Sequence, residues 1–330
     1  MPSNELKDKK VLITGGAGFI GSNLIETLLE QNNKIVCLDN FSTGKRENIE
    51  PFLRHEKFTL VEGDIRDLDT CHKAVEDIEI VLHQAALGSV PRSINDPVTT
   101  NQVNIDGFLN MLVASKEANV KRFVYAASSS TYGDHPGLPK VEEKIGKPLS
   151  PYAVTKYVNE LYADVFYKTY GLETIGLRYF NVFGKRQDPE GAYAAVIPKF
   201  IKQLISGKSP VINGDGLTSR DFTFIDNVVQ INQLAAITDN PEAINQVFNV
   251  AFGENTSLNE LVYLLKSNLS KSDPTIADIE VIYGPERAGD VKHSLANIDK
   301  GKELLGYNPP VDFKEGLKRT VRWHESYVSE

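Results

Sequence analysis

Three glycines at intervals of three residues, Gly15, Gly18 and Gly21, constrain the fold of this chain more than any other feature. They follow a short apolar run at 10–14 and precede a segment with apolar residues at helical spacing. Glycines between a strand and a helix allow a tight turn, in which the free N–H groups of the helix can bind a pyrophosphate. The spacing differs by one residue from the commoner G-x-G-x-x-G, and a purely structural turn is the alternative. The pattern predicts a dinucleotide-binding turn.

Alternation of strands and helices continues through the first half of the chain. Apolar runs typical of strands occur at 34–39, 58–64, 78–86 and 122–128, and helix-like segments occur near 69–77 and 98–118. Continuous apolar strands are expected in a parallel sheet that helices cover on both faces. The sequence therefore predicts an α/β fold with a doubly wound parallel sheet of the Rossmann type.

The alternation becomes less regular after Gly171. A buried strand is expected within 173–184, a polar stretch follows it, and a helix is expected over 196–206. The apolar run at 246–252 again has the character of a sheet strand. We therefore expect a first domain over 1–185, to which the chain returns near 222–255, and a smaller α/β domain formed mainly by 186–330.

Composition excludes several classes of function. The chain has 330 residues, 41% of them hydrophobic and 24% charged, and a net charge of -8 with both signs interleaved. This distribution gives no cationic surface for nucleic acid or for an anionic membrane, and it favours small-molecule partners. Two cysteines, Cys37 and Cys71, provide neither a disulfide framework nor the spacing of a metal site. The polar amino terminus has no apolar leader, so a cytoplasmic location is expected.

Carboxylates after the predicted strands indicate which dinucleotide binds. Asp39 ends the second strand, 18 residues after Gly21, where a carboxylate can accept hydrogen bonds from an adenosine ribose and repel a 2′-phosphate. NAD is therefore favoured, although Lys45 and Arg46 keep NADP open. Asp64 follows the third strand and is expected beside the adenine, with a helix cap as the alternative. The small residues that end the fourth strand would let the cofactor approach, or else serve core packing.

A tyrosine and a lysine four residues apart form the candidate reactive pair. Ser150 as N-cap and Pro151 in the first turn predict a helix that places Tyr152 and Lys156 on one face. An unperturbed tyrosine titrates near pH 10, and a neighbouring ammonium favours the phenolate that a general base needs. Ser128, at the end of the fifth strand, can hydrogen-bond the same substrate oxygen. Ordinary exposed helix and turn residues are the alternative interpretation.

These motifs occur together and in one order, along with RYFNVFG at 178–184. Over about residues 10–325 the chain resembles the extended short-chain dehydrogenases/reductases, specifically the nucleotide-sugar 4-epimerases. GSVPRSINDP at 88–97, YGDHPGLPKVEE at 132–143, RQDPEGAYAAVIPKF at 186–200 and DVKHSLA at 290–296 resemble the UDP-N-acetylglucosamine 4-epimerase branch. The resemblance implies NAD as cofactor and a UDP-sugar as substrate.

The resemblance assigns roles residue by residue. Tyr152 is expected to be the acid/base, Lys156 to hold the nicotinamide ribose, and Ser128 to assist. The cofactor is expected to contact Gly15, Gly18, Phe19, Ile20, Gly21, Asp39, Asn40, Ser42, Thr43, Gly44, Asp64, Ile65, Gln84, Ala85, Ala86, Tyr152, Lys156 and Tyr179. The substrate is expected to contact Ser89, Ser128, Ser129, Asn181, Gln187, Ala195, Val196, Arg220, Arg287, Asp290 and Ser294.

The resemblance also implies a reaction, in which a hydride passes from C4 to NAD and returns to the opposite face of a 4-keto sugar. Serine at 294, where galactose-only epimerases carry tyrosine, leaves room for an acetamido group, so UDP-N-acetylhexosamines are the expected substrates. A UDP-N-acetylhexosaminuronate epimerase, in which Arg92 could meet the carboxylate, and a UDP-uronate decarboxylase are the alternatives. SSSTYG lacks the Asp-Glu pair of the dehydratases, and the intact catalytic residues disfavour a non-catalytic NAD-binding module. Family members form homodimers through helices that here correspond to 98–118 and 152–170.

Overall fold

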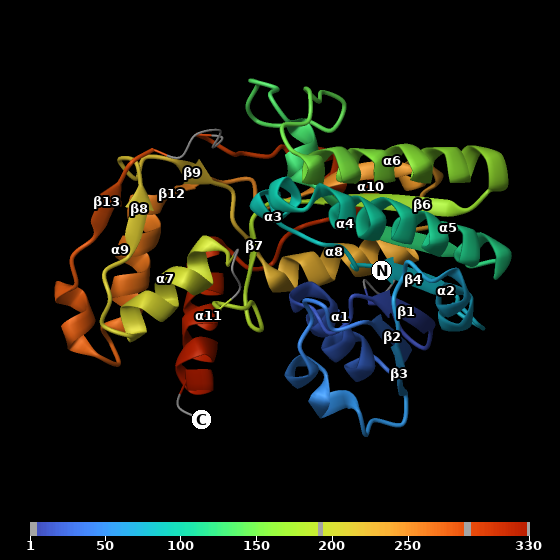
Figure 1. The fold of residues 1–330 in the computed structure, drawn as a ribbon, viewed down its shortest axis with the longest axis horizontal. Coiled ribbons are helices and arrows are strands. Elements are labelled where there is room, and N and C mark those ends of the chain that lie inside the picture. Colours follow the sequence, from blue (N-terminus) through green and yellow to red (C-terminus); the bar gives the residue numbers. More distant parts are fainter. Residues whose placement is uncertain (1–4, 191–193, 287–291, 329–330) are drawn as a thin grey trace.

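A computed structural model describes residues 5–190, 194–286 and 292–328. Its central element is a parallel sheet of seven strands, in the order β11-β6-β5-β4-β1-β2-β3 (Figure 1). The predicted doubly wound α/β fold is therefore confirmed. The strands are β1 (Lys10–Thr14), β2 (Lys34–Asp39), β3 (Phe58–Glu62), β4 (Ile80–His83), β5 (Arg122–Ser128), β6 (Glu173–Tyr179) and β11 (Gln246–Val250).

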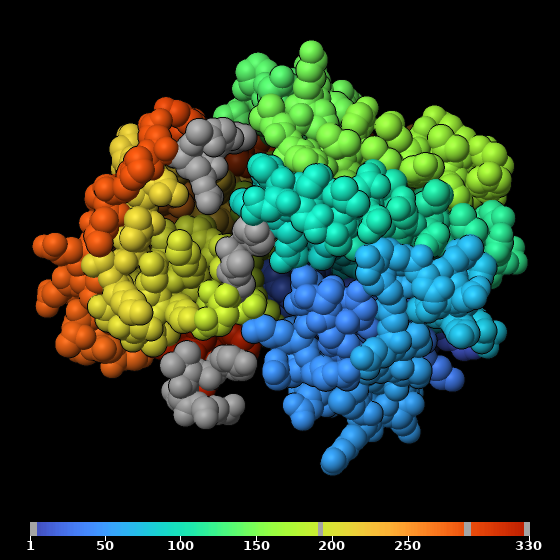
Figure 2. Space-filling view, viewed as in Figure 1, coloured from blue at the N-terminus to red at the C-terminus, as the bar shows by residue number. Residues whose placement is uncertain are grey.

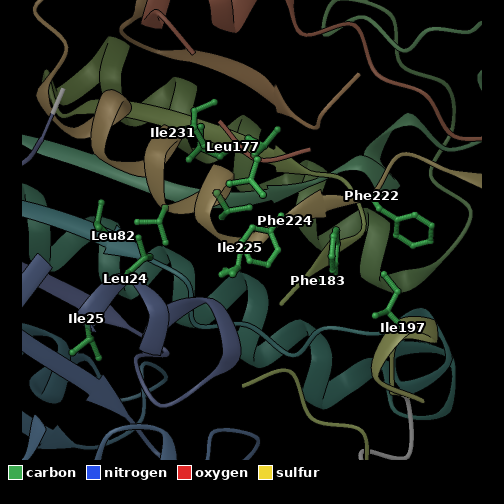
Figure 3. Close-up of a cluster of buried hydrophobic side chains, with 14 of the residues drawn as sticks. Leu24, Ile25, Leu82, Leu177, Phe183, Ile197, Phe222, Phe224, Ile225 and Ile231 are labelled. Carbon is green, nitrogen blue, oxygen red and sulfur yellow. The ribbon is translucent and has the colours of Figure 1, made fainter. Parts of the chain in front are cut away.

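Alternate residues of each strand point to opposite faces, and each face has its own helices. Helices α1 (Phe19–Glu30) and α8 (Ile225–Ile237) pack with Ile13 and Leu82 in one buried cluster. Figure 3 shows Leu82 and Ile231 within this cluster. The helices α2 (Leu68–Ala74), α5 (Gly107–Glu117) and α6 (Pro151–Tyr170) pack with Leu12 and Val81 in the other. Because both faces are covered, the central strands are mainly apolar and buried.

The helix expected over 98–118 is present as a helical run over 97–117, and it contains a π-helical turn that was not predicted. A short helix α4 (Pro97–Asn101) leads into a π-helical turn over Gln102–Asp106, and α5 begins only at Gly107. The buried Asn104 side chain in this turn binds the backbone of Leu87 at both N and O, and its amide also donates to Thr155. Apolar periodicity does not register such a turn, because one extra residue shifts the pattern only slightly.

The second part of the chain is built from short elements to one side of the sheet (Figure 1). The expected strand over 173–184 is divided into β6 and a two-residue β7 (Val182–Phe183), which pairs with β10 (Thr223–Phe224). Two more pairs are β9 (Ser219–Arg220) with β12 (Thr256–Ser257), and β8 (Val211–Asn213) with β13 (Ile282–Gly284). The other helices in the second part of the chain are α7 (Val196–Ile205), α9 (Leu258–Leu269), α10 (Asp299–Leu305) and α11 (Phe313–Val328), whereas α3 (Val90–Asn95) follows β4 in the first part.

The two parts of the chain share one buried core. Strand β11 pairs in parallel with β6, so residues 246–250 lie within the sheet although much of the second part precedes them. Phe183, Phe222 and Ile197 belong to the same apolar cluster as Leu24 of α1 (Figure 3). Consequently the carboxyl ends of the strands, where open parallel sheets bind ligands, face the short elements. Figure 2 shows the surface hollowed between the blue amino-terminal elements and the yellow elements around α7.

Candidate active site

The turn after β1 requires its glycines. Gly15 has φ +66°, and a Cβ there would lie 2.8 Å from Cα of Ala85. A Cβ on Gly21 would lie 2.2 Å from the carbonyl oxygen of Gly15. Side chains at these positions would therefore collide with backbone, and without them the start of α1 is open to a phosphate. Strand order reverses between β1 and β4, so the turn lies at the switch point of the sheet.

A cavity of about 360 Å³ opens beside this turn. Every residue that the sequence assigned to the cofactor lines it, except Tyr152, Lys156 and Tyr179. Those lining residues are Gly15, Gly18, Phe19, Ile20, Gly21, Asp39, Asn40, Ser42, Thr43, Gly44, Asp64, Ile65, Gln84, Ala85 and Ala86. Arg186 and Asp188, from the polar stretch after β7, complete the wall and were not predicted. The glycine turn and the polar side chains in its wall suit a dinucleotide, and it is called the cofactor cavity below.

The acidic residue at the end of β2 orders the loop that encloses the cofactor cavity. One oxygen of Asp39 accepts from Ala17 N at 2.9 Å and the other from Phe41 N at 2.8 Å. Burial raises the pKa of Asp39, and these backbone donors oppose the rise. The basic residues that kept NADP open form ion pairs, Lys45 with Asp188 at 3.0 Å and Arg46 with Glu62 at 2.6 Å. This arrangement favours NAD, because a 2′-phosphate would meet the Asp39 carboxylate.

Asp64 also lies in the wall of the cofactor cavity, and it does not cap a helix. The Arg66 guanidinium donates to both Asp64 oxygens, at 3.0 and 2.7 Å, and Asn40 donates at 2.8 Å. These bonds lower the pKa of Asp64 to about 2. Helix α2 has Asp67 at its N-cap position instead. The alternative interpretation of Asp64 as a cap is therefore wrong.

Ser128, Tyr152 and Lys156 come together where β5 ends and α6 begins. Helix α6 starts at Pro151, and Ser150 accepts from Ala153 N at 3.1 Å, as the sequence predicted. The Ser128 side chain hydrogen-bonds the Tyr152 hydroxyl. The Lys156 ammonium is buried, donates to Ala126 O at 2.8 Å and lies 6.0 Å from the Tyr152 ring centroid.

The pKa of Tyr152 differs from the expectation. Burial raises it above its usual value, and the hydrogen bond with Ser128 opposes the rise. Burial lowers the pKa of Lys156 to about 8, with Glu160 opposing. The expected lowering of the tyrosine pKa by Lys156 does not appear, because desolvation outweighs the attraction of an ammonium on the far side of the ring. A phenolate at neutral pH needs a further positive charge near Tyr152.

Tyr179 lies beside the cofactor cavity without lining it. Its hydroxyl donates to Gln84 Oε1 at 3.0 Å and accepts from Asn232 Nδ2 at 2.9 Å. Burial raises the Tyr179 pKa to about 12, so this phenol stays neutral. Its contact with the cavity passes through Gln84, whose orientation it fixes.

A second cavity, of about 600 Å³, has Ser128 in its wall and is called the substrate cavity below. Five residues assigned to the substrate line it: Ser128, Ser129, Asn181, Arg220 and Ser294. Four others do not line it: Ser89, Gln187, Ala195 and Val196. Arg287 and Asp290 fall outside the described residues. The structure thus brings Asn181 and Arg220, the predicted phosphate-side residues, together with Ser128 in the wall of one cavity.

The four predicted residues that do not line the substrate cavity lie in nearby segments. Ser89 has φ +104° and accepts from Arg92 N as N-cap of α3, in the segment that passes from one cavity to the other. Gln187 donates to Val182 O at 2.9 Å, and its buried Oε1 has no hydrogen-bond partner among the described residues. Ala195 and Val196 begin α7. All four residues were predicted from the resemblance to the family. Such an alignment does not determine the path that a loop takes in this chain.

Several residues that line the substrate cavity were not predicted from the sequence. Lys140 and His293 are polar members of its wall, and Phe180 and Leu149 are apolar members. Lys140 is buried and stands in an irregular loop, where no periodicity marks it. Arg92 does not line the cavity. The described residues contain no group of three or more metal-ligating side chains that could hold an ion.

Comparison with known proteins gives consistent results. The model of the NAD dependent epimerase/dehydratase family matches residues 11–251. A putative UDP-glucose 4-epimerase of Methanocaldococcus jannaschii is 39% identical over 315 residues, which are 95% of this chain and 97% of that protein. No helix of the described residues is long and apolar enough to cross a bilayer.

Two solved structures extend the comparison. The structure of a UDP-N-acetylglucosamine 4-epimerase from Methanobrevibacter ruminantium, in complex with UDP-N-acetylmuramic acid, is 43% identical. It has a TM-score of 0.90 and covers 98% of this chain and 100% of its own. A UDP-glucuronic acid 4-epimerase from Bacillus cereus, solved with UDP-glucuronic acid and NAD, is 30% identical, with a TM-score of 0.86 over 96% of this chain and 99% of its own. The chain belongs to the NAD dependent epimerase/dehydratase family.

Proposed function

We propose that this protein is an NAD-dependent UDP-sugar 4-epimerase, and that it acts reversibly on UDP-N-acetylhexosamines. The observation that carries the proposal is that Ser128, the hydrogen-bond partner of Tyr152, lines the substrate cavity, which adjoins the cofactor cavity at residues 88–90. A sugar whose diphosphate meets Arg220 could present its C4 hydroxyl to this pair. Residues 1–185, with the segment that returns to the sheet, would hold NAD, and 186–330 would hold most of the sugar nucleotide.

The residues of the chain supply positioning and proton transfer. Tyr152 removes the proton from the C4 hydroxyl and later returns it, while Ser128 hydrogen-bonds the same oxygen. NAD, which the residues of the cofactor cavity would hold, would supply hydride transfer at C4 in both directions, and its cationic ring would favour the tyrosinate. Lys156, with a pKa of about 8, stays mainly protonated at pH 7 and is placed to hold the nicotinamide ribose. Arg220 would hold the diphosphate while the 4-keto sugar rotates to present its opposite face.

The preference for an acetamido sugar rests on Ser294. This small side chain lies in the wall of the substrate cavity, where a tyrosine would fill space. The relative from Methanobrevibacter ruminantium, named for UDP-N-acetylglucosamine, is consistent with it. The second candidate is a UDP-N-acetylhexosaminuronate, and the observation that favours it is the buried cation Lys140 in the same wall, in place of the expected Arg92.

Incubation of the purified protein with UDP-N-acetylglucosamine, without added cofactor, tests the proposal. Appearance of the galacto epimer, resolved by chromatography, is the expected result, and Ser294→Tyr should slow this reaction more than that of UDP-glucose. Conversion of the uronate at a higher kcat/KM would move the assignment to the second candidate. Absence of any C4 epimer from all three nucleotides would sink the proposal.

We also propose that the protein is a homodimer through a helical bundle that includes α6. Val154, Leu161 and Val165 follow one another at helical spacing on this helix and are 46%, 49% and 51% exposed. A stripe of this kind is typical of a helix that packs against a partner. Light scattering of the purified protein should give twice the mass of the chain, and Leu161→Glu should lower it to one chain. A wild-type mass of 36.6 kDa would contradict the dimer.

A further inference from the structure

The carboxylate next to Arg220 is the least expected group near the substrate cavity. Asp221 is 0% exposed, and both of its oxygens accept backbone hydrogen bonds. Oδ1 accepts from Phe252 N at 3.1 Å and from Gly253 N at 3.3 Å. Oδ2 accepts from Gly253 N at 3.2 Å and from Ala296 N at 3.1 Å. A buried carboxylate therefore ties together two loops that are more than 40 residues apart in sequence.

These bonds reach three residues in the wall of the substrate cavity. Asp221 follows Arg220, and its own carbonyl oxygen accepts from Asn181 Nδ2 at 3.0 Å. Ala296, which donates to the carboxylate, is two residues from Ser294, and Ser294 N donates to Ser219 O at 3.1 Å. Asn181, Arg220 and Ser294 all line the cavity. Asp221, which does not line the cavity, thus binds Asn181 through its carbonyl oxygen and the segment of Ser294 through its carboxylate.

The charge of Asp221 is balanced by backbone alone. Among the described residues no lysine or arginine forms an ion pair with it, and Glu254 is a neighbouring charge of like sign. Burial raises the Asp221 pKa to about 7, and the N–H groups of Ala296, Phe252 and Gly253 oppose the rise. The hydroxyl of the nearby Tyr307 donates elsewhere, to Ala251 O. Burying a carboxylate in this way costs stability, and only the backbone donors that its two oxygens bind offset this cost.

We propose that Asp221 is a positioning residue for the sugar nucleotide, whose carboxylate holds Arg220, Asn181 and Ser294 in the arrangement that binds the UDP-sugar. The inference rests on the proposed function for the identity of the ligand. It goes beyond that function because Asp221 touches neither cofactor nor substrate and lines neither cavity. The ionised carboxylate suits this arrangement, since it accepts at both oxygens and has no O–H donor to face the backbone N–H groups.

The isosteric variant Asp221→Asn tests the inference. Its amide N–H₂ would face a backbone N–H, so one of the two loops should shift. We expect the KM for the UDP-sugar and the Kd for UDP, measured by calorimetry, to rise about tenfold or more. The kcat should change less than threefold, and the amount of NAD that copurifies should stay at the wild-type level. The matched control is Asp226→Asn, because Asp226 pairs with Arg319 at the surface and should leave every value unchanged.

The outcomes separate the inference from the proposed function. Unchanged KM and Kd in a folded Asp221→Asn protein would overturn the inference, as would equal losses of UDP and NAD binding, which indicate a general structural role. If Asp221→Asn does not fold, Asp221→Glu keeps the charge but lengthens the side chain. Weaker UDP binding by its folded fraction then supports the inference, and wild-type affinity contradicts it. A wild-type protein that binds UDP but epimerises nothing would reject the proposed reaction, and the UDP affinities would still decide the role of Asp221.

Discussion

The cofactor cavity and the substrate cavity, which adjoin at residues 88–90, are built in different ways. The cofactor cavity is formed almost entirely by residues 15–103, at the ends of four strands and the start of α1, and its shape depends on glycine backbone. The substrate cavity draws on segments spread over 90–294, and its shape depends on side chains that bind distant loops. One cavity is thus a product of local sequence and the other of tertiary contacts, and changes in each should affect only one ligand.

The largest effect is expected at Tyr152, the hydrogen-bond partner of Ser128. Tyr152→Phe removes the proton-transfer group, so kcat should fall about 10²- to 10⁴-fold. Neither ligand should be lost, because Tyr152 lines neither cavity, and the variant should copurify with the same amount of NAD. Steady-state kinetics and the absorbance of released nucleotide measure both quantities. Turnover near the wild-type rate would show that another group moves the proton.

Gly21→Ala should remove the cofactor and leave the substrate cavity intact. The added Cβ would lie 2.2 Å from the Gly15 carbonyl oxygen, a backbone contact that cannot relax by side-chain rotation. Copurified NAD should fall below a tenth of the wild-type amount, with UDP affinity unchanged. Gly284→Ala is the control, because the nearest atom to its Cβ lies 3.7 Å away. Joint loss of NAD and UDP binding would show that the two cavities are not independent.

Arg220→Ala should have the opposite effect. Its guanidinium lines the substrate cavity, where a charged hydrogen bond to a diphosphate contributes about 1.5–3 kcal/mol. We expect the KM for the UDP-sugar to rise about 10- to 100-fold, while bound NAD stays constant. Arg319→Ala, which removes a surface arginine paired with Glu315, should change neither. If Arg220→Ala lowered kcat and left KM unchanged, the diphosphate would bind elsewhere.

The same difference between the cavities explains what the sequence could predict. Gly15, Asp39 and Asp64 follow strands whose apolar runs are visible in the sequence, so their meeting at one sheet edge is a consequence of the fold. Lys140 stands in an irregular loop, and only tertiary contacts bring it to the substrate cavity. Asn104 lies in a π-helical turn that apolar spacing does not reveal.

The resemblance to the family assigned residues to the substrate, and some of these line the substrate cavity while others do not. It located Arg220 and Ser294, whose segments are held by Asp221, within the wall. It also named Gln187 and Ala195, which line neither cavity in this chain. Alignment transfers a residue but does not transfer the path of the loop around it. An alignment therefore locates a site residue most reliably where buried hydrogen bonds fix the backbone of its segment.

The smallest effect is expected at an exposed ion pair, Lys45–Asp188, that joins the two parts of the chain at the wall of the cofactor cavity. Asp188 follows β7, and its partner Lys45 follows β2. Both side chains are more than a third exposed, so the pair contributes at most about 1 kcal/mol. Asp188→Asn should therefore speed NAD dissociation by no more than about fivefold, as measured by fluorescence of the released nucleotide.

The loop that carries Asp188 has a second attachment, which is why the effect should be small. Arg186 binds Glu26 of α1 at 3.0 Å, and Lys185 O accepts from Asn23 Nδ2 at 3.2 Å. Glu117→Gln, at an exposed pair remote from both cavities, is the control. A change well above fivefold would mean that the second part of the chain helps to retain NAD. The cofactor cavity would then depend on a tertiary contact in the same way as the substrate cavity, and the contrast between them would not hold.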